Sequence, residues 1–455
     1  MKLHEECGVF GIYDPTGDCA RSTYYGLYAL QHRGQEACGI AAINDRELSF
    51  HKGLGLVGEV FTPEILGRLG GTMAVGHVRY ATTGGGRLEN AQPLTLQYVK
   101  GTLAVAHNGN LVNTHALRTE FEYKGAIFQT TTDSEIIAYA IARERLRCPS
   151  AEEAVQRAMG RLRGAFSLIV MSARKLIAAR DPWGFRPLCM GRRGDAVVFA
   201  SESCALDAVG AVFERDVDPG EIVVVEEGQM RSLRSNCTGG KGSMCIFEYI
   251  YFARPDSVIE GQSVHQARRL AGRALAREYP VEADIVIGVP DSGRDAALGY
   301  AEQAGIPYGE GLIKNRYIGR TFITPGQGAR EDAVRLKLAA LRSEVDGKRV
   351  VMIDDSIVRG TTCSQIIRLL RQAGARQVHM RVTAPPFIAP CYFGTDIPDR
   401  EKLIACHHTV EEIAEMTGAD SLGFLSLDAL HTIAPGARCG FCDGCFTGRY
   451  PIEVT

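Results

Sequence analysis

The chain has 455 residues, and its 51 Lys and Arg nearly balance its 53 Asp and Glu, giving a formal net charge of -2. This balance gives no electrostatic reason to expect nucleic acid or a membrane surface as a partner. Hydrophobic residues make up 45% and charged residues 23%, values typical of a soluble globular protein of two or three domains, which excludes a disordered chain.

Membrane and secreted classes are also unfavoured. The sequence has no run of 18 apolar residues and no apolar secretory segment at its start, so we expect a cytoplasmic protein. Its 14 cysteines would then lie in a reducing compartment. There, clustered cysteines indicate metal binding or catalysis rather than disulfides.

Up to about residue 235, the sequence predicts short strands, Gly-rich turns and two helices. The predicted strands cover residues 73–78, 103–106, 166–171, 196–200 and 222–225, and the helices cover 134–146 and 151–162. Runs of strands with few helices between them favour a mostly antiparallel α+β layer structure.

The small, polar segment 234–243 is the predicted domain boundary. Beyond it, residues 283–289 and 349–353 are short apolar runs rich in Val and Ile, and each precedes a polar loop and a helical pattern. This alternation indicates βαβ units and a parallel sheet. We therefore expect one domain over residues 7–238 and a second over 239–455.

Cys7 would become an N-terminal nucleophile if residues 1–6 were removed as a propeptide. Its thiol would then lie beside a free α-amine, whose pKa of about 7.7–8.0 leaves part of it neutral and able to accept the thiol proton. Taken alone, the pattern is a weak signal, because a cysteine near the start of a chain is more often a small buried apolar residue.

Further motifs favour the catalytic interpretation. In chain order they are Gln31-His-Arg-Gly-Gln-Glu, Gly76-His-Val-Arg-Tyr-Ala-Thr, Ala106-His-Asn-Gly-Asn-Leu, Thr132-Asp-Ser-Glu and Asp181-Pro-Trp-Gly-Phe-Arg-Pro-Leu. As a set, over about residues 7–235, they resemble the N-terminal-nucleophile glutamine amidotransferases. The resemblance implies a four-layer α+β domain that hydrolyses glutamine to glutamate and ammonia through a thioester on Cys7.

The same resemblance assigns roles to four more residues. Acyl transfer needs donors aimed at a developing oxyanion, and the side-chain amide of Asn108 and the backbone N–H of Gly109 match those positions. Arg79 matches the residue that binds the glutamine carboxylate, and Asp133 matches the residue that binds its ammonium. The structural alternatives are a surface ion pair for Arg79, a turn at Asn108-Gly109 and a helix N-cap at Asp133.

The second half contains Arg349-Val-Val-Met-Ile-Asp-Asp-Ser-Ile-Val-Arg-Gly-Thr-Thr362, a strand that leads through two acids into a polar loop and a helix. It resembles the phosphoribosyl diphosphate (PRPP) motif of the type I phosphoribosyltransferases. Asp354 and Asp355 would accept from ribose hydroxyls or face Mg²⁺, at the sheet edge where ligands of parallel sheets bind. The loop lies at a helix N-terminus, where backbone N–H groups and hydroxyls can bind a phosphate. Its candidate residues are Ser356, Arg359, Gly360, Thr361 and Thr362. A strand end with solvated acids is the structural alternative.

Two other segments support this interpretation. Ser292, in the loop that follows the strand 283–289, matches a family position near the metal. Residues 314–323 resemble a mobile catalytic loop, in which Lys314, Arg316 and Arg320 would neutralise departing pyrophosphate. A solvated basic loop is the alternative.

Four cysteines complete the set. Cys442 and Cys445 form a C-x-x-C pair, and the resemblance adds Cys245 and Cys391 as ligands of a [4Fe–4S] cluster that ties the C-terminal tail to the second domain. Cys439 forms a second C-x-x-C pair with Cys442, so the spacing alone does not decide whether Cys439 or Cys442 is the ligand. Zinc is the chemical rival, since four cysteines do not by themselves choose the metal.

Together the halves resemble the self-processing, iron–sulfur glutamine PRPP amidotransferases over essentially the whole chain. The resemblance implies synthesis of 5-phosphoribosylamine, pyrophosphate and glutamate from glutamine, PRPP and water, with ammonia crossing the domain interface. It also implies Mg²⁺, inhibition by purine nucleotides and a homotetramer. The rival hypotheses are a non-catalytic PRPP-sensing regulator and an amidotransferase with another acceptor.

Overall fold

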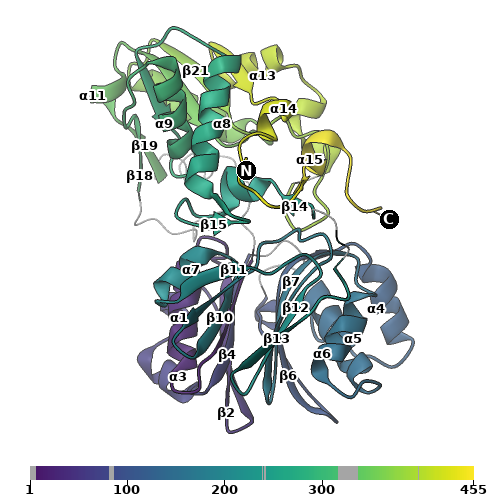
Figure 1. The fold of residues 1–455 in the computed structure, drawn as a ribbon. Helices are drawn as coiled ribbons and strands as arrows, with labels where there is room; N and C mark the ends of the chain where they lie inside the picture. The colour runs from purple at the N-terminus through teal and green to yellow at the C-terminus, as the bar shows by residue number, and fades with distance from the viewer. Residues whose placement is uncertain are drawn as a thin grey trace.

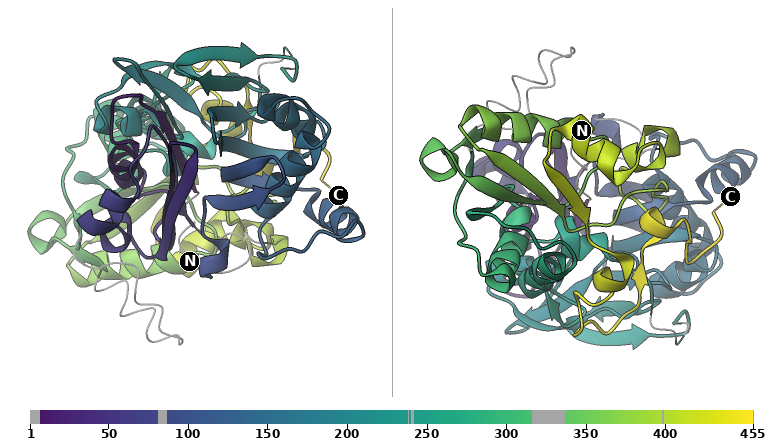
Figure 2. Two further views of the ribbon diagram at one scale, coloured as in Figure 1. Left: turned by 90° about the horizontal axis from the view of Figure 1, so that it is seen from below. Right: turned by 90° about the horizontal axis from the view of Figure 1, so that it is seen from above.

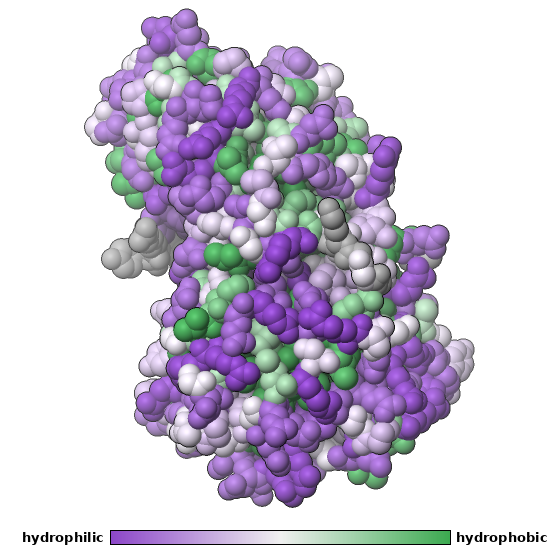
Figure 3. All heavy atoms as spheres, in the orientation of Figure 1, coloured by the Kyte–Doolittle hydropathy of each residue, from purple (hydrophilic) through white to green (hydrophobic). Residues whose placement is uncertain are grey.

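The computed structural model describes residues 7–80, 87–237, 239, 242–315, 337–397 and 399–454. The first half of the sequence forms the lower lobe in Figure 1, and the second half forms the upper lobe. The face seen in Figure 3 is mostly hydrophilic over both lobes. In the described part of the chain, no helix has the length and apolar character needed to cross a membrane.

Two antiparallel sheets build the lower lobe. The strand order in the first is β11 (Val212–Asp216), β9 (Cys189–Arg193), β10 (Ala196–Ala200), β1 (Gly8–Tyr13), β4 (Met73–Arg79), β2 (Ala37–Asn44) and β3 (Glu47–Leu54). The order in the second is β13 (Gln229–Leu233), β12 (Ile222–Glu226), β8 (Lys175–Arg180), β7 (Gly164–Ser172), β6 (Gly101–Leu111) and β5 (Leu94–Tyr98).

The two sheets pack face to face, and helices cover their outer faces (Figure 1). Val9, Ile169 and Phe199 belong to the fully buried core between the sheets. Helices α1 (Cys19–Ala29) and α7 (Ser203–Ala208) cover the first sheet, and α4 (Thr114–Glu122), α5 (Asp133–Arg145) and α6 (Ala151–Met159) cover the second. The predicted four-layer α+β architecture is therefore confirmed.

The helix prediction was incomplete in this half. Helices α5 and α6 lie where the sequence predicts them, but α1 and α4 were missed, as were the short helices α2 (Val57–Val60) and α3 (Pro63–Arg68). The buried face of α1 consists largely of small residues such as Cys19, Ala20 and Thr23. In α4 only two residues are buried. Neither helix carries the long apolar stripe on which sequence-based detection depends.

The upper lobe is built on a four-stranded parallel sheet, which confirms the second predicted fold. The strand order is β17 (Ile285–Gly288), β20 (Arg349–Asp354), β21 (Gln377–Val382) and β22 (Ser421–Phe424). Helices α8 (Val264–Glu278) and α9 (Gly293–Ala304) lie on one face, and α12 (Thr361–Gln372) and α13 (Val410–Thr417) lie on the other (Figure 2). The Val- and Ile-rich strands are buried on both faces, as expected for a parallel sheet covered by helices.

Shorter elements join this sheet to the lower lobe. The π-helical turn η2 (Glu248–Phe252) and the two-residue strand β14 (Met244–Cys245) follow the crossover, and β14 pairs in parallel with β23 (Phe441–Cys442) of the C-terminal tail. Further short elements are β15 (Val258–Ile259), β16 (Gln262–Ser263), β18 (Leu312–Lys314), β19 (Leu338–Ala340), α11 (Arg342–Val345), α14 (Leu427–Leu430) and α15 (Gly444–Thr447).

Two predictions about the chain's organisation stay predictions. The predicted boundary falls at residues 238 and 239, where Thr238, Gly240 and Lys241 lie outside the described residues. The predicted propeptide, residues 1–6, also lies outside them.

Candidate active sites

Cys7 lies directly before β1, a strand held between β10 and β4 in the first sheet. Its side chain is half-buried, and its Sγ donates to the Tyr80 carbonyl at 3.6 Å. On the main-chain side, Arg33 Nε donates to the Cys7 carbonyl at 3.1 Å. The thiol is thus presented at a strand end while a buried arginine holds the backbone of the same residue.

Arg79, the last residue of β4, lies beside this strand end. Its side chain is buried, and the segment that contains Arg33 packs closely against it. A Cβ at Gly34 would lie 2.6 Å from the Arg79 backbone nitrogen, so this approach requires glycine. The Gln31–Glu36 motif therefore supports both Cys7 and the predicted carboxylate-binding arginine.

Asn108 and Gly109 lie in β6 of the second sheet. The Asn108 side chain is buried, and its Nδ2 has no hydrogen-bond partner among the described residues. Gly109 has φ +143°, and a Cβ there would lie 2.1 Å from the Ala165 carbonyl oxygen. A buried amide donor left without a partner is costly unless a ligand accepts from it, and an oxyanion is such a ligand.

Asp133 begins helix α5 and contacts the same part of β6. Its Oδ2 accepts from the Leu111 backbone N–H at 2.9 Å, and its Oδ1 lies 3.8 Å from His107 Nδ1. Burial lowers the pKa of His107 although the Asp133 charge opposes this. The structure therefore brings Asp133 to the strand that carries Asn108 and Gly109.

A hydrogen bond between the two sheets joins the halves of this site. His77 Nε2 in β4 lies 3.0 Å from the His107 carbonyl in β6. Burial lowers the pKa of His77 to about 3, so its imidazole is neutral at physiological pH. Arg79 lies two residues beyond His77, and Asn108 follows His107, so the predicted glutamine-site residues of both sheets meet at one end of the sandwich.

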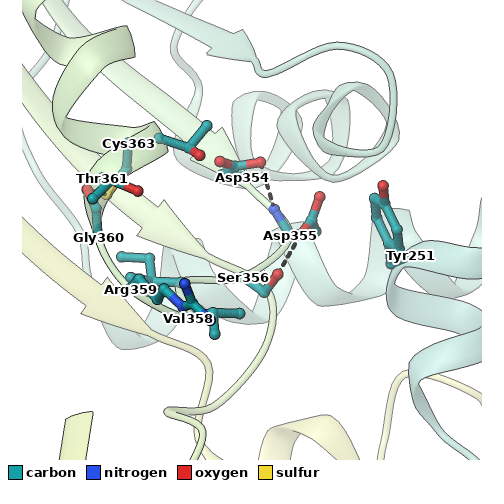
Figure 4. A pocket seen from close by; sticks show the side chains of 11 residues that line it. Tyr251, Asp354, Asp355, Ser356, Val358, Arg359, Gly360, Thr361 and Cys363 are labelled. Carbon is teal, nitrogen blue, oxygen red and sulfur yellow. Dashed lines mark hydrogen bonds between the residues drawn. The ribbon is translucent and has the colours of Figure 1, made fainter. Parts of the chain in front are cut away.

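The second candidate site is a cavity where β20 passes into α12 (Figure 4). The lining includes every predicted residue of the PRPP motif, namely Asp354, Asp355, Ser356, Arg359, Gly360, Thr361 and Thr362. Gly360 caps α12 with φ +76°, which glycine adopts without strain. Tyr251 of η2 faces the acids from a different part of the chain.

The two acids differ in their surroundings. Asp354 is buried, and its Oδ1 accepts from the Asp355 backbone N–H at 3.0 Å. Asp355 accepts from the Ser292 hydroxyl at 2.5 Å and from the Ser356 hydroxyl. The structure thus brings Ser292 to the acid pair, as the predicted metal site requires.

The basic loop is only partly described. Lys314, at the end of β18, donates from Nζ to Asp291 Oδ2 at 2.6 Å, close to the Ser292 loop. Arg316 and Arg320 lie outside the described residues.

The donors around Asp355 fit Mg²⁺ that is shared with a substrate. In the described ranges, no group of three or more His, Cys, Asp or Glu side chains is arranged to hold a metal ion. Mg²⁺ keeps several waters and commonly takes only one or two carboxylates from the protein, the rest coming from substrate phosphates. Two carboxylates and a serine hydroxyl therefore suit a substrate-borne Mg²⁺ better than a resident ion.

The four predicted cluster cysteines line one cavity. Cys245, Cys391, Cys442 and Cys445 share it with aromatic walls that include Phe185, Phe247, Phe393 and Tyr450. Burial raises the pKa of Cys442 to about 12 and raises that of Cys445 well above its ordinary value. Cys439 is not among the lining residues, and its nearest charges are Glu260, Arg180 and Asp216.

Comparison with known proteins gives a consistent answer. Residues 77–208 match the glutamine amidotransferase domain family, and residues 259–386 match the phosphoribosyl transferase domain family. The amidophosphoribosyltransferase of Archaeoglobus fulgidus is 50% identical over 98% of each chain, and that of Bacillus subtilis is 50% identical over 99% of this chain and 95% of its own. The chain belongs to the amidophosphoribosyltransferase family.

A solved structure agrees with this assignment. The glutamine PRPP amidotransferase of Bacillus subtilis, in complex with ADP and GMP, superimposes with a TM-score of 0.92 at 49% identity, over 99% of this chain and 98% of that one. This chain and the Bacillus subtilis enzyme therefore share both halves and their order along the sequence.

Several residues at these amidophosphoribosyltransferase sites were not assigned roles from the sequence. Arg33 lies inside the Gln31–Glu36 motif, which indicated the family but assigned no role to the arginine. Tyr251, Glu248 and Arg186 lie in segments whose sequence gives no indication of which distant residue they meet. Only the folded chain shows that Tyr251 faces the acid pair.

Proposed function

We propose that this protein is an amidophosphoribosyltransferase that makes 5-phosphoribosylamine, pyrophosphate and glutamate from glutamine, PRPP and water. This reaction is the first committed step of purine synthesis. The observation that carries the proposal is the pairing in one chain of the Cys7 site, with its unpartnered Asn108 amide, and the acid-and-hydroxyl cavity at Asp354. The full-length relatives named amidophosphoribosyltransferase support it.

In the glutamine half, removal of residues 1–6 gives Cys7 a free amine. That amine takes the proton of Sγ as the sulfur attacks the glutamine side-chain carbonyl. Asn108 Nδ2 and the Gly109 N–H stabilise the oxyanion, while Arg79 and Asp133 hold the substrate's carboxylate and ammonium. The proton passes to the departing ammonia, and water then cleaves the thioester to release glutamate.

In the phosphoribosyl half, the hydroxyls and backbone N–H groups at the start of α12 bind the 5-phosphate. Asp354 and Asp355 bind the ribose hydroxyls and orient C1. Ammonia that has crossed the interface forms the new C–N bond as the C–O bond to the diphosphate breaks. Lys314, Arg316 and Arg320 neutralise the pyrophosphate that leaves. Mg²⁺, held beside Asp355 and Ser292, would supply further charge neutralisation on the diphosphate.

The four-cysteine cavity supports a [4Fe–4S] cluster bound by Cys245, Cys391, Cys442 and Cys445. Four thiols that line one pocket suit a cluster held by four thiolates, and zinc, which also takes four thiolates, is the alternative that elemental analysis tests. Its role would be structural, because Cys245 lies in β14 and Cys442 in the tail strand that pairs with it.

Elemental analysis of anaerobically purified protein tests the cluster. We expect about four iron and four sulfide per chain, together with loss of iron in Cys445→Ser. Cys439→Ser is the matched control and should keep its iron, because Cys439 does not line the cavity. Stoichiometric zinc, or loss of iron in the control alone, would contradict this assignment.

Regulation, assembly and location form the remaining part of the proposal. Purine nucleotides inhibit the enzyme, which acts as a cytoplasmic homotetramer. The Bacillus subtilis structure in complex with ADP and GMP supports nucleotide binding. Inhibition assays with GMP and ADP, and the mass in solution, test these points.

The main test uses protein whose N-terminal mass shows that it begins at Cys7. Glutamate release is followed with and without PRPP and Mg²⁺, and pyrophosphate is measured in parallel. We expect strong stimulation by PRPP and matching pyrophosphate release. Glutamate release that is unaffected by PRPP would favour an amidotransferase with another ammonia acceptor. No glutamate release at all would favour a PRPP-sensing regulator.

A further inference from the structure

A carboxylate of the upper lobe, Glu248, is buried against two arginines of the lower lobe. Arg33 binds it with two hydrogen bonds, Nη2 to Oε1 at 2.8 Å and Nη1 to Oε2 at 2.9 Å. Arg186 Nη1 lies 3.6 Å from Oε1. All three side chains have no exposed surface, so neither lobe alone completes this group of charges.

Each arginine also binds a backbone carbonyl that matters to one of the sites. Arg33 donates from Nε to the Cys7 carbonyl at 3.1 Å. Arg186 donates from Nε and Nη2 to the Phe393 carbonyl, at 3.2 and 2.7 Å, two residues beyond Cys391. Glu248 therefore lies between the backbone of the nucleophile and the loop that carries one cavity cysteine.

The segment that carries Glu248 is itself firmly held. Arg268 donates to the carbonyls of Tyr249, Tyr251 and Ala253, at 2.8, 2.9 and 2.7 Å. Tyr251 lines the PRPP cavity, three residues from Glu248. Glu248 is thus anchored to a rigid part of the phosphoribosyl site.

Charge balance explains why Glu248 is needed. Arg33 also contacts Glu202 at 2.5 Å, and Glu202 in turn contacts His32 at 2.7 Å, so two carboxylates, Glu202 and Glu248, are shared among Arg33, Arg186 and His32. A buried guanidinium that loses its carboxylate is strongly destabilised and turns toward other acceptors. The bidentate contact also fixes the plane of the Arg33 guanidinium, which sets the direction of its Nε bond to Cys7.

We propose that Glu248 is a positioning residue for glutamine hydrolysis, which holds Arg33 against the Cys7 carbonyl from the phosphoribosyl lobe. The inference rests on the proposed function. Because amine and thiol belong to the same residue, the orientation of the Cys7 backbone sets the distance over which the proton moves. Because the Arg33 Nε bond acts on the Cys7 backbone, the effect falls on turnover rather than on glutamine affinity.

The test compares Glu248→Gln with Glu260→Gln. Glu260 is a matched control because it also lies in the upper lobe and pairs with a buried lower-lobe arginine, Arg180, at 2.5 Å, without reaching Cys7. In Glu248→Gln we expect kcat with glutamine to fall roughly 10–100-fold at nearly constant KM, because small misplacements of a reacting group have effects of this size. Synthesis from free ammonia should stay within about twofold, as should both activities of the control.

A second readout does not depend on turnover. The rate of Cys7 alkylation by iodoacetamide, followed by mass spectrometry of the N-terminal peptide, should fall in Glu248→Gln and be unchanged in Glu260→Gln. Glu248→Asp, which keeps the charge, should restore part of both the glutamine activity and the alkylation rate.

Three results would overturn the proposal: equal losses of glutamine and ammonia activity, a rise in KM alone, or an unchanged alkylation rate. If Glu248→Gln does not fold, Arg33→Lys provides the same test, because it keeps the positive charge but removes the Nε donor. A wild-type protein inactive with both nitrogen sources would count against the proposed function, and the alkylation rates would still decide the role of Glu248.

Discussion

The two candidate sites are assembled in opposite ways. The glutamine site combines four residues from segments that lie far apart in the sequence: Cys7 directly before β1, Arg79 of β4, Asn108 of β6 and Asp133 of α5. Among the described residues, the lining of the PRPP cavity is mostly the continuous stretch 354–363, to which Tyr251 is added from η2, and Ser292 bonds to Asp355 from a distant loop. The first site therefore depends on how two sheets pack, and the second depends mainly on one strand, loop and helix.

This difference determines where each site's polar groups find their partners. In the glutamine site, Arg79 and Asn108 are buried and preorganised by the sheets around them. In the PRPP cavity, the Ser292 and Ser356 hydroxyls bond to the Asp355 carboxylate. We expect the substrate to provide the remaining hydrogen-bond partners of these groups. Substitutions should therefore separate the two activities in one direction: damage to the glutamine site spares synthesis from ammonia, whereas damage to the PRPP site removes both.

The largest effect is expected from the double variant Asp354→Asn with Asp355→Asn. It keeps the shape of the strand end but removes both charges that face the ribose and the metal. We expect synthesis from glutamine and from ammonia to fall at least about a thousandfold, since both need an oriented PRPP. Pyrophosphate release measures both.

Asp284→Asn is the control for that double variant. Asp284 bonds to Arg349 at the opposite end of the same strand, β20, so it tests charge removal away from the cavity. It should keep both activities. Normal rates in the double variant would contradict the assignment of Asp354 and Asp355 to the ribose site.

Cys7→Ala should abolish only one activity. Without the thiol no thioester forms, and we expect glutamine-dependent synthesis to fall roughly a thousandfold or more while ammonia-dependent synthesis persists. Cys237→Ala, which changes another half-buried thiol of the same lobe, should keep both activities. Loss of the ammonia activity in Cys7→Ala would argue against separate sites.

Asn108→Ala should have a smaller effect on the same activity. Removing one oxyanion donor reduces kcat by about 10²–10³-fold, so glutamine hydrolysis should fall by this factor with ammonia-dependent synthesis unchanged. Asn113→Ala is the matched control, because the Asn113 amide bonds to the backbone of Arg161 and Arg163. A large rise in the KM for glutamine at unchanged kcat would instead place Asn108 in substrate binding.

The same contrast explains what could be predicted from the sequence. The PRPP motif is local, so its strand, loop and helix could all be predicted in order, and every cavity residue from Asp354 to Thr362 named for it lies where expected. The glutamine site was found through several short motifs, which named its residues but not the contacts between them. Glu248 lies outside these short motifs and Arg186 lies inside the Asp181–Leu188 motif, but the sequence could pair neither of them, because the partners of a buried charge are set by tertiary packing.

The folds show a similar limit. Strands such as β10 and β17 were predicted because continuous apolar runs are strong local signals. Helix α1 was missed because small residues suffice to pack against a sheet at close range. The two sheets of the lower lobe, and therefore the meeting of Arg79 with Asn108, follow from pairings between residues that are far apart in the chain.

The smallest predicted effect concerns stability alone. Glu152, at the start of α6, bonds to Lys175 of β8 and Arg231 of β13, which ties the outer helix to the second sheet. Burial by itself would raise the pKa of Glu152, but the hydrogen bonds from Arg231, the helix backbone and Lys175 outweigh it and lower the pKa to about 2. A carboxylate with a lowered folded-state pKa stabilises the fold above its unfolded pKa, about 4.3, and this stability is lost as the pH falls toward 2.

Glu152→Gln should therefore lower the stability of the glutamine lobe by about 1–2 kcal/mol at pH 7, because the partly exposed Arg231 weakens the pair, and by roughly half as much at pH 3. The urea midpoint measures this, with Glu153→Gln as a control, since Glu153 pairs only along the helix with Arg157. Both activities should be unchanged in the folded protein, because α6 contributes no residue to either site. A selective loss of glutamine activity would mean that the outer helix layer also sets the geometry at Asn108. Helix α6 would then have to be counted as part of the glutamine site rather than as scaffold.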